Sequence, residues 1–189
     1  ITLDDYPSSQ NFPGHVLEQT LLEQSQDDDM KQFLNVEAAE VTYEDSIWVG
    51  YRAFNTRKLA TAYPFGFGLS YTTFQHDELE LSAKQFKGAL EVQVTVTNTG
   101  EVAGKEVVQL YLTAPQGDLI KPALELKGFA KTQCLTPGAS QTLQFSLTEL
   151  DLASFDPIAD HWVCTAGTYR IHIGASSEDI RQWTDFEKS

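Results

Sequence analysis

The stretch Leu90–Thr97, LEVQVTVT, decides the fold class of this chain. Its even-numbered positions carry leucine or valine, and its odd-numbered positions carry polar residues. This period of two is the period of a β-strand with one buried face and one solvated face. The sequence Asn-Thr-Gly follows at 98–100 and has the composition of a turn. The stretch therefore predicts a strand that packs one face on a core and ends at a turn.

Short segments of the same kind follow along the rest of the chain, separated by Pro-, Gly- and Asn-containing turns. The predicted strands begin near Leu79 and include residues 90–97, 107–112, 124–131, 141–147, 162–164 and 169–174. About seven short strands with turn signals between them are typical of an antiparallel β-sandwich of the immunoglobulin or fibronectin type III kind. We therefore expect a mainly β protein.

The first third of the chain lacks this alternation. Residues 16–35 have a weakly amphipathic helical spacing and contain the run Asp-Asp-Asp at 27–29. We interpret the run as a solvated loop, because a calcium loop spaces its ligands more widely. Residues 41–54, VTYEDSIWVGYRAF, favour a strand and a loop. This part of the chain is not expected to build a core alone.

The stretch 63–71, YPFGFGLSY, carries four aromatic residues, two glycines and one proline in nine positions, without any charge. It is too short to span a membrane, and too interrupted by Gly and Pro for the interior of a helix. Alternating glycines allow a tight bend while the large apolar side chains pack on either side. The stretch therefore predicts a packed hinge between two domains.

Composition bounds the function classes. The 189 residues suit one large domain, or one complete domain with part of another. Hydrophobic residues make up 41% and charged residues 21%, which is ordinary for a globular protein. A net charge of −14 disfavours nucleic acid, because phosphates would be repelled. There is no apolar run of membrane-spanning length and no signal peptide. The chain begins at Ile1 without a methionine, which suggests processing or a piece of a longer protein.

The two cysteines, Cys134 and Cys164, have no zinc-binding spacing and no clustered histidines, so no metal is expected. Each precedes a turn, so they either meet as a disulfide at one end of the sandwich or remain free thiols. The four histidines are scattered, and His172 alternates with two isoleucines, which places it on an exposed strand face. None has the neighbours of a catalytic triad.

Several segments together resemble the C-terminal part of the family three glycoside hydrolases, the β-glucosidases and β-xylosidases. The resemblance runs over about residues 7–181, with the motifs in the family's order and with 16–35 as a variable insertion. The segments that carry it are PSSQNFPG (7–14), YEDSIWVGYRAF (43–54), YPFGFGLSYTTF (63–74), VTVTNTGEVAGKEVVQLYL (94–112), ELKGFAK (125–131) and GASSEDIR (174–181).

The resemblance implies a domain map. Residues 1–62 would be the C-terminal segment of an α/β-sandwich domain, 63–75 the crossing between domains, and 76–189 a fibronectin type III-like domain. The family's catalytic pair, an Asp nucleophile on a barrel and a Glu acid/base, lies upstream of these motifs. Retaining enzymes need two carboxylates close together across the scissile bond. No catalytic residue and no cofactor is therefore expected here, and the chain should be inactive alone.

The resemblance also implies candidate substrate contacts. In the family's layout the segment between Arg52 and Tyr63 faces the mouth of the active site. A guanidinium donates to sugar hydroxyls, and an aromatic ring stacks on a pyranose. Arg52, Tyr63 and Trp48, with Phe54 as the alternative to Trp48, are therefore candidates for an acceptor subsite. The alternative is that Arg52 pairs with an acid and the aromatic rings fill a core.

Other carboxylates and aromatic residues have plainer interpretations. Glu44 and Asp45 are expected to decorate or cap a loop. A carbohydrate-binding platform would need exposed aromatic rings. We expect Trp162 in the core, Tyr111 facing outward from its strand, and Trp183 on the surface.

The sequence therefore predicts the C-terminal portion of a retaining, exo-acting β-glucosidase that hydrolyses terminal non-reducing β-D-glucosyl residues. Its partners would be the barrel and α/β-sandwich domains of the parent enzyme and a β-glucoside or oligosaccharide substrate. Neither nucleic acid nor a membrane is an expected partner. A secreted or periplasmic location is expected. The alternative is a free-standing fibronectin-like module that binds carbohydrate or protein without catalysis, against which residues 1–62 speak.

Overall fold

The computed structural model describes residues 5–10, 15–16 and 39–189, in two compact units, Ile1–Val49 and Gly50–Ser189. In the first unit, the 3₁₀-helix η2 (Pro7–Gln10) precedes β1 (His15–Val16), which pairs antiparallel with β2 (Ala39–Glu40). The predicted helical spacing after Val16 and the three-aspartate run lie outside the described residues.

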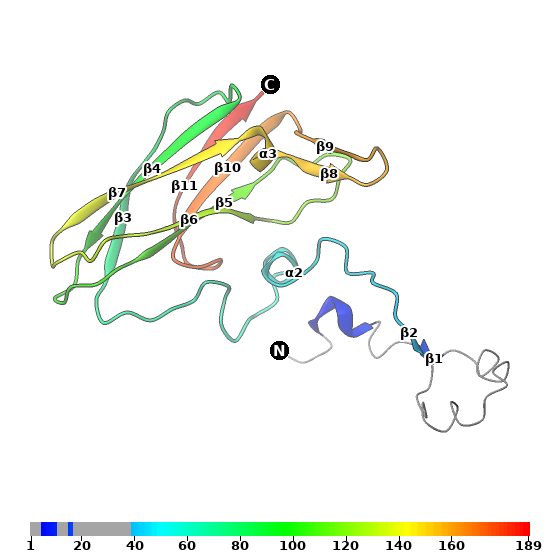
Figure 1. Cartoon of the computed structure of the whole chain (residues 1–189), viewed down its shortest axis with the longest axis horizontal. Helices are drawn as coiled ribbons and strands as arrows, with labels where there is room; N and C mark the ends of the chain where they lie inside the picture. Colours follow the sequence, from blue (N-terminus) through cyan, green and yellow to red (C-terminus); the bar gives the residue numbers. More distant parts are fainter. Residues whose placement is uncertain (1–4, 11–14, 17–38) are drawn as a thin grey trace, which may run out of the picture. The chain divides into compact units, whose positions relative to one another are not determined.

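The second unit is a sandwich of two antiparallel sheets (Figure 1). The three-stranded sheet has the order β3-β4-β7, and the four-stranded sheet has the order β11-β10-β5-β6. The strands are β3 (Phe74–Leu81), β4 (Ala89–Asn98), β5 (Val107–Thr113), β6 (Glu125–Lys131), β7 (Ser140–Thr148), β10 (Gly167–Gly174) and β11 (Ile180–Lys188). The mainly β fold class is confirmed.

The core lies between the inner faces of the two sheets. The stretch 90–97 falls inside β4, the central strand of its sheet, and its four even-numbered residues are fully buried. They pack with apolar residues of the other sheet, including Leu110, Ile171 and Phe186. Burying each such side chain contributes about 1.5–3 kcal/mol relative to leaving it exposed. The alternation seen in the sequence is therefore the alternation of the core.

Asn98, the last residue of β4, is the polar exception in this core and has no exposed surface. Its Nδ2 donates to the carbonyls of Val102 and Leu135, both at 2.8 Å. Its Oδ1 accepts from Thr72 Oγ1 at 2.7 Å and from the backbone N–H of Gly100 at 3.1 Å. The amide thus ties the turn after β4 to two other segments, with all its hydrogen-bonding capacity used.

The longest strand that the sequence did not predict is β11 (Ile180–Lys188). In β11, IRQWTDFEK, the inward positions alternate with Arg181, Trp183 and Asp185, but only Phe186 is both apolar and fully buried. Strand β11 forms because it pairs with β10 along its whole length. The hydrogen bonds to β10 stabilise an extended conformation that the weakly apolar pattern of β11 does not predict.

A helix replaces part of the predicted strand and loop at 41–54. The described residues 41–50 form no strand, and α2 (Tyr51–Arg57) follows Gly50, whose φ is +55°. Lys58, with φ of +55°, ends α2 in the left-handed conformation. The aromatic composition suggested a strand, but Ala53 and Phe54 are buried by a helix instead.

The structure corrects three aromatic and histidine predictions. Trp162 is not in the core, since 57% of it is exposed, whereas Trp183 is on the surface as predicted. Tyr111 does point away from the core, but Tyr51 of α2 covers it, with ring centroids 5.9 Å apart. His172 is half-buried beside Thr113 Oγ1, at 2.9 Å, and burial lowers the pKa of its imidazole.

Both cysteines are free thiols, Cys134 exposed and Cys164 half-buried. Over the described ranges 5–10, 15–16 and 39–189, no helix is long and apolar enough to cross a bilayer. Within the same ranges, no three His, Cys, Asp or Glu side chains gather to hold a metal ion.

Candidate functional site

The stretch 63–71 connects α2 to β3 and exposes most of its apolar side chains. Leu69 is 91% exposed and Tyr71 is 99% exposed, and half or more of Tyr63 is accessible. Phe65 and Phe67 are each about half exposed. The predicted hinge is therefore packed on one side only, and its other side is an open apolar surface. We call the stretch 63–71 the aromatic segment.

The packed side of the aromatic segment is held by specific contacts. The Phe65 ring stacks on Tyr51 of α2 at 4.9 Å, and the Phe65 carbonyl accepts from the Ser177 N–H at 2.9 Å. The segment's backbone is therefore fixed to α2 and to the loop after β10, while its outer side chains stay free of the sandwich.

Gln109 of β5 forms hydrogen bonds with the backbone of the aromatic segment and of the loop after β10. It is 5% exposed, and its Nε2 donates to the Ala175 carbonyl at 2.9 Å and weakly to the Gly66 carbonyl at 3.5 Å. The Tyr111 hydroxyl donates to its Oε1. Burial raises the pKa of Tyr111 well above its usual value, so this hydroxyl stays protonated and acts as a donor.

A pocket of about 630 Å³ lies between the aromatic segment and the loop after β10. Such a volume falls in the range of small-molecule sites, about 300–1,000 Å³. Phe67 and Phe74 give it apolar walls, and Glu106, Asp179 and Arg181 give it charged ones. The pocket is formed entirely by residues of the second unit.

Two of the charged pocket residues, Arg181 and Asp179, form an ion pair with each other. Arg181 donates to both carboxylate oxygens of Asp179, at 3.2 and 2.9 Å, and to the Phe74 carbonyl at 2.6 Å. The hydrogen bonds from Arg181 lower the pKa of Asp179, so its carboxylate stays ionised. Buried His76 places Nε2 3.5 Å from Glu106 Oε1. A carboxylate held ionised is a poor general acid, so Asp179 is suited to binding more than to proton transfer.

The sequence did not predict the pocket. Glu106 and Asp179 lie in separate turns of the chain, and only the fold brings them together with Phe67. The motif GASSEDIR pointed to the right loop as a family feature, but no spacing within it indicates a cavity.

Of the three predicted substrate contacts, Arg52 and Tyr63 belong to the second unit and Trp48 to the first. Arg52 lies on α2, with Nη2 3.0 Å from Glu125 Oε1, and Lys127 approaches the other Glu125 oxygen at 3.3 Å. Tyr63 is exposed, with its ring 5.2 Å from that of Phe67. Trp48 belongs to the first unit, where its backbone N–H donates to the Asp45 carbonyl at 2.9 Å. Their assignment to an acceptor subsite stays a prediction.

Comparison with known proteins identifies the family that this chain resembles. Residues 106–177 match the fibronectin type III-like domain family. The chain is 39% identical to β-glucosidase A of Butyrivibrio fibrisolvens, over 95% of this chain and 21% of that protein. The chain matches the C-terminal fifth of family three β-glucosidases. It spans only about a fifth of the length of these curated relatives.

Solved β-glucosidase structures agree with this family assignment. The structure of β-glucosidase 3B from Thermotoga neapolitana in complex with glucose superposes with a TM-score of 0.79 at 40% identity, covering 97% of this chain and 22% of that one. The GH3 β-glucosidase of Bifidobacterium adolescentis gives a TM-score of 0.82 at 33% identity, covering 99% and 24%. The likeness to family three β-glucosidases therefore extends well beyond the β-sandwich that the family match covers.

Proposed function

We propose that this chain works as the C-terminal portion of a retaining, exo-acting β-glucosidase that hydrolyses terminal non-reducing β-D-glucosyl residues. In this proposal the chain braces the catalytic domains, and it carries neither of the two catalytic carboxylates itself. The observation that carries it is the aromatic segment, which the sandwich fixes by its backbone while Leu69 and Tyr71 stay almost fully exposed.

The physical support is the cost of leaving such a surface in water. Burial of apolar area stabilises by about 25 cal/mol per Å². A contiguous apolar patch on a rigid support is typical of an interaction site. The relatives have about four-fifths of their length beyond the part matched here, so the occupant we propose is the preceding catalytic region of the same enzyme.

The three predicted substrate contacts fit the same proposal. Arg52 has one hydrogen-bonding nitrogen committed to Glu125, and its side chain is 41% exposed. A guanidinium carries five donors, so the remaining ones can reach sugar hydroxyls. We assign Arg52, together with Tyr63 and Trp48, to the rim of the acceptor subsite in the complete enzyme. The acidity of the chain also fits a secreted or periplasmic enzyme, which fractionation of the source cells would test.

An activity comparison tests the catalytic part of the proposal. The 189-residue chain is expected to give no turnover of an aryl β-glucoside, because a retaining mechanism needs a carboxylate pair about 5–5.5 Å apart. The longest reading frame that contains residues 1–189 is expected to be active. In that enzyme Arg52→Ala should change the preference among disaccharide aglycones while aryl glucoside hydrolysis persists.

Robust turnover by the 189-residue chain would contradict this division of labour. If the longest reading frame that contains residues 1–189 encodes no barrel domain, the free-standing fibronectin-like binding module would be favoured instead. An unchanged aglycone preference in Arg52→Ala would remove Arg52 from the subsite without affecting the rest.

A charge placed on the aromatic segment tests the bracing role. Leu69→Asp is expected to shift the melting temperature of the 189-residue chain by less than about 2 °C, because a surface substitution changes stability by about 0.5 kcal/mol or less. In the protein encoded by the longest reading frame, Leu69→Asp should lower the melting temperature several-fold more than it does in the 189-residue chain. There the substitution would bury an unpaired charge against the catalytic region.

Ile120→Asp is the matched control for Leu69→Asp, since Ile120 is also an exposed apolar residue, at 73%, and lies outside the aromatic segment. It should affect the short and long proteins equally. Equal effects of Leu69→Asp in both proteins would show that the aromatic segment contacts nothing in the longer enzyme.

A further inference from the structure

A small hairpin at one end of the sandwich carries two exposed aromatic rings. The strands β8 (Ser154–Asp156) and β9 (His161–Val163) pair antiparallel in a two-stranded sheet of their own, at the right-hand end of the sandwich in Figure 1. Phe155 and Trp162 are direct partners across it. They are 44% and 57% exposed, although the sequence placed the tryptophan in the core.

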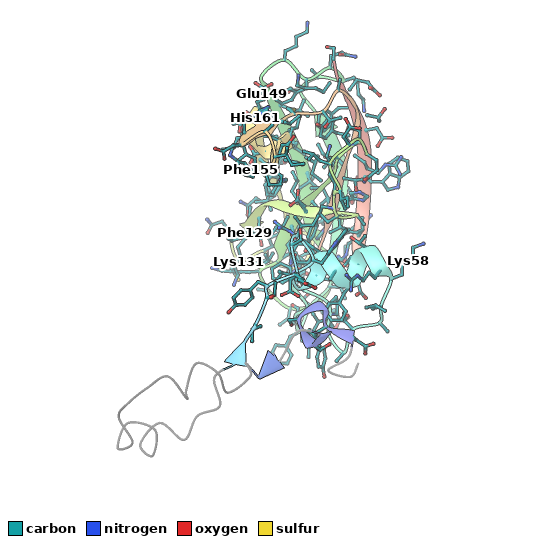
Figure 2. The ribbon with its side chains drawn as sticks, turned by 90° about the vertical axis from the view of Figure 1, so that its right-hand side faces the viewer. Lys58, Phe129, Lys131, Glu149, Phe155 and His161 are labelled. Atoms are coloured by element: carbon teal, nitrogen blue, oxygen red, sulfur yellow. The ribbon has the colours of Figure 1, made fainter. Side chains whose placement is uncertain are left out.

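The two rings form an ordered pair. Their centroids are 5.6 Å apart and their planes meet at 67°, the edge-to-face arrangement that aromatic side chains favour. Figure 2 shows Phe155 and His161 of this hairpin on the outside of the sandwich, near Glu149. The ring pair therefore presents apolar surface to solvent in a defined orientation.

The hairpin that carries the rings is itself stiffened. The Asp156 carboxylate accepts from the backbone N–H groups of Ile158 and Ala159 at 2.9 and 3.1 Å, which lowers the pKa of Asp156. At the base of the hairpin, α3 (Glu149–Leu152) starts with a reciprocal capping box between Thr148 and Asp151. A rigid support lowers the entropy that a ligand must remove on binding.

We propose that Phe155 and Trp162 form a binding site for a neutral glucan chain. The apolar C–H face of a pyranose ring packs on an exposed indole, and neighbouring polar groups receive its hydroxyls. Asp160, exposed in the turn of the same hairpin, has carboxylate oxygens that can accept from sugar hydroxyls. The site lies outside the aromatic segment and adds polymer binding to the proposed hydrolase function.

Charge and size favour a neutral sugar polymer over other ligands. The net charge of −14, with Asp156 and Asp160 in the hairpin itself, opposes nucleic acids and anionic lipid surfaces. A stable protein interface buries about 800 Å² on each partner with about 20–30 residues. The hairpin spans only 154–163, which is too small for such an interface but large enough for a sugar ring on each aromatic face.

Native gel electrophoresis of the 189-residue chain, with and without hydroxyethyl cellulose in the gel, tests the site. The unsubstituted chain is expected to be retarded by the polymer. Trp162→Ala should raise the dissociation constant about ten-fold, because it removes the larger of the two ring surfaces on which a sugar can stack. Trp162→Phe, which keeps a ring, should retain most of the retardation, and Phe155→Ala should have an intermediate effect.

Trp183→Ala is the matched control. Trp183 is equally exposed, at 59%, but the Arg170 guanidinium lies 4.0 Å over its ring and the Asp185 carboxylate holds that arginine at 2.7 Å. Its loss should leave the retardation unchanged. Thermal melts of each variant confirm that the sandwich is folded, and only folded variants are compared.

Three outcomes would overturn the inference: no retardation of the unsubstituted chain, equal loss of retardation in Trp162→Ala and Trp183→Ala, or sizing that finds the unsubstituted chain to be a dimer and Trp162→Ala to be a monomer. The choice of a glucan rests on the proposed function, but retardation requires no catalysis. A failed gel with an active long enzyme therefore rejects the hairpin site alone, and retardation with an inactive long enzyme rejects the hydrolase proposal alone.

Discussion

Asn98→Ala is expected to destabilise the sandwich by about 4 kcal/mol, the largest effect of any single substitution proposed for this chain. The alanine would leave the Val102 carbonyl, the Thr72 hydroxyl and the Gly100 N–H without the amide that satisfies them, whereas the Leu135 carbonyl would keep the Gly104 N–H as a donor. An unsatisfied buried polar group costs about 1–3 kcal/mol, and partial entry of water recovers some of that cost. Urea unfolding followed by tryptophan fluorescence measures the free energy.

Thr97→Ala is the neighbouring control for Asn98→Ala. Thr97 exchanges a single hydrogen bond with Ser140, at 2.8 Å on the solvent side of the sheet, and its loss should cost about 1 kcal/mol or less. A difference of under 1 kcal/mol between the two variants would show that the turn reorganises without its amide.

Gly66→Ala is expected to destabilise the chain by about 3 kcal/mol and to loosen the aromatic segment. Gly66 has φ of +84°, and a Cβ there would overlap the side-chain amide of Gln109. Gln109 has no room to retreat without releasing the Ala175 carbonyl and the Tyr111 hydroxyl, since it is 5% exposed. A lower melting temperature with faster proteolysis between 63 and 71 would report this loosening.

Gly68→Ala separates this effect from the general loss of a glycine. Two positions later in the same segment, a Cβ on Gly68 meets no atom within 4 Å, and its φ is not in the left-handed range. It should be neutral or slightly stabilising, by up to about 1 kcal/mol, because it restricts the unfolded chain. Equal destabilisation by both alanines would contradict the role given to Gln109.

The sandwich could be predicted from the sequence because its central strands carry their own signal. Strand β4 alternates without exception, and every apolar residue from 90 to 96 is buried. Strand β11 has one fully buried apolar residue, Phe186, and owes its conformation to pairing with β10. The alternation of apolar and polar residues thus identifies strands that build the core. It misses a strand such as β11, whose conformation is stabilised by hydrogen bonds to the neighbouring strand.

The failed predictions share a cause, which is that a side chain's exposure depends on residues distant in sequence. Tyr111 does face outward from its sheet, but it is covered by Tyr51 of α2, a helix that lies more than fifty positions before it in the sequence. Trp162 has a large apolar side chain of the kind expected in a core, but it lies on the β8–β9 hairpin, outside the two sheets of the sandwich. The pairing of Arg52 with Glu125, left open by the sequence, likewise required the fold to bring β6 beside α2.

The edge of the four-stranded sheet has a consequence for how the chain behaves at high concentration. Strand β6 has a neighbour on one side only and exposes Phe129, which Figure 2 shows beside Lys131. An open edge with an apolar side chain invites pairing with another molecule, as in amyloid growth. Lys131 is exposed two positions after Phe129 on the same strand, so a second copy of β6 paired in parallel register would bring like charges together. Lys131 therefore opposes edge-to-edge aggregation of the sandwich.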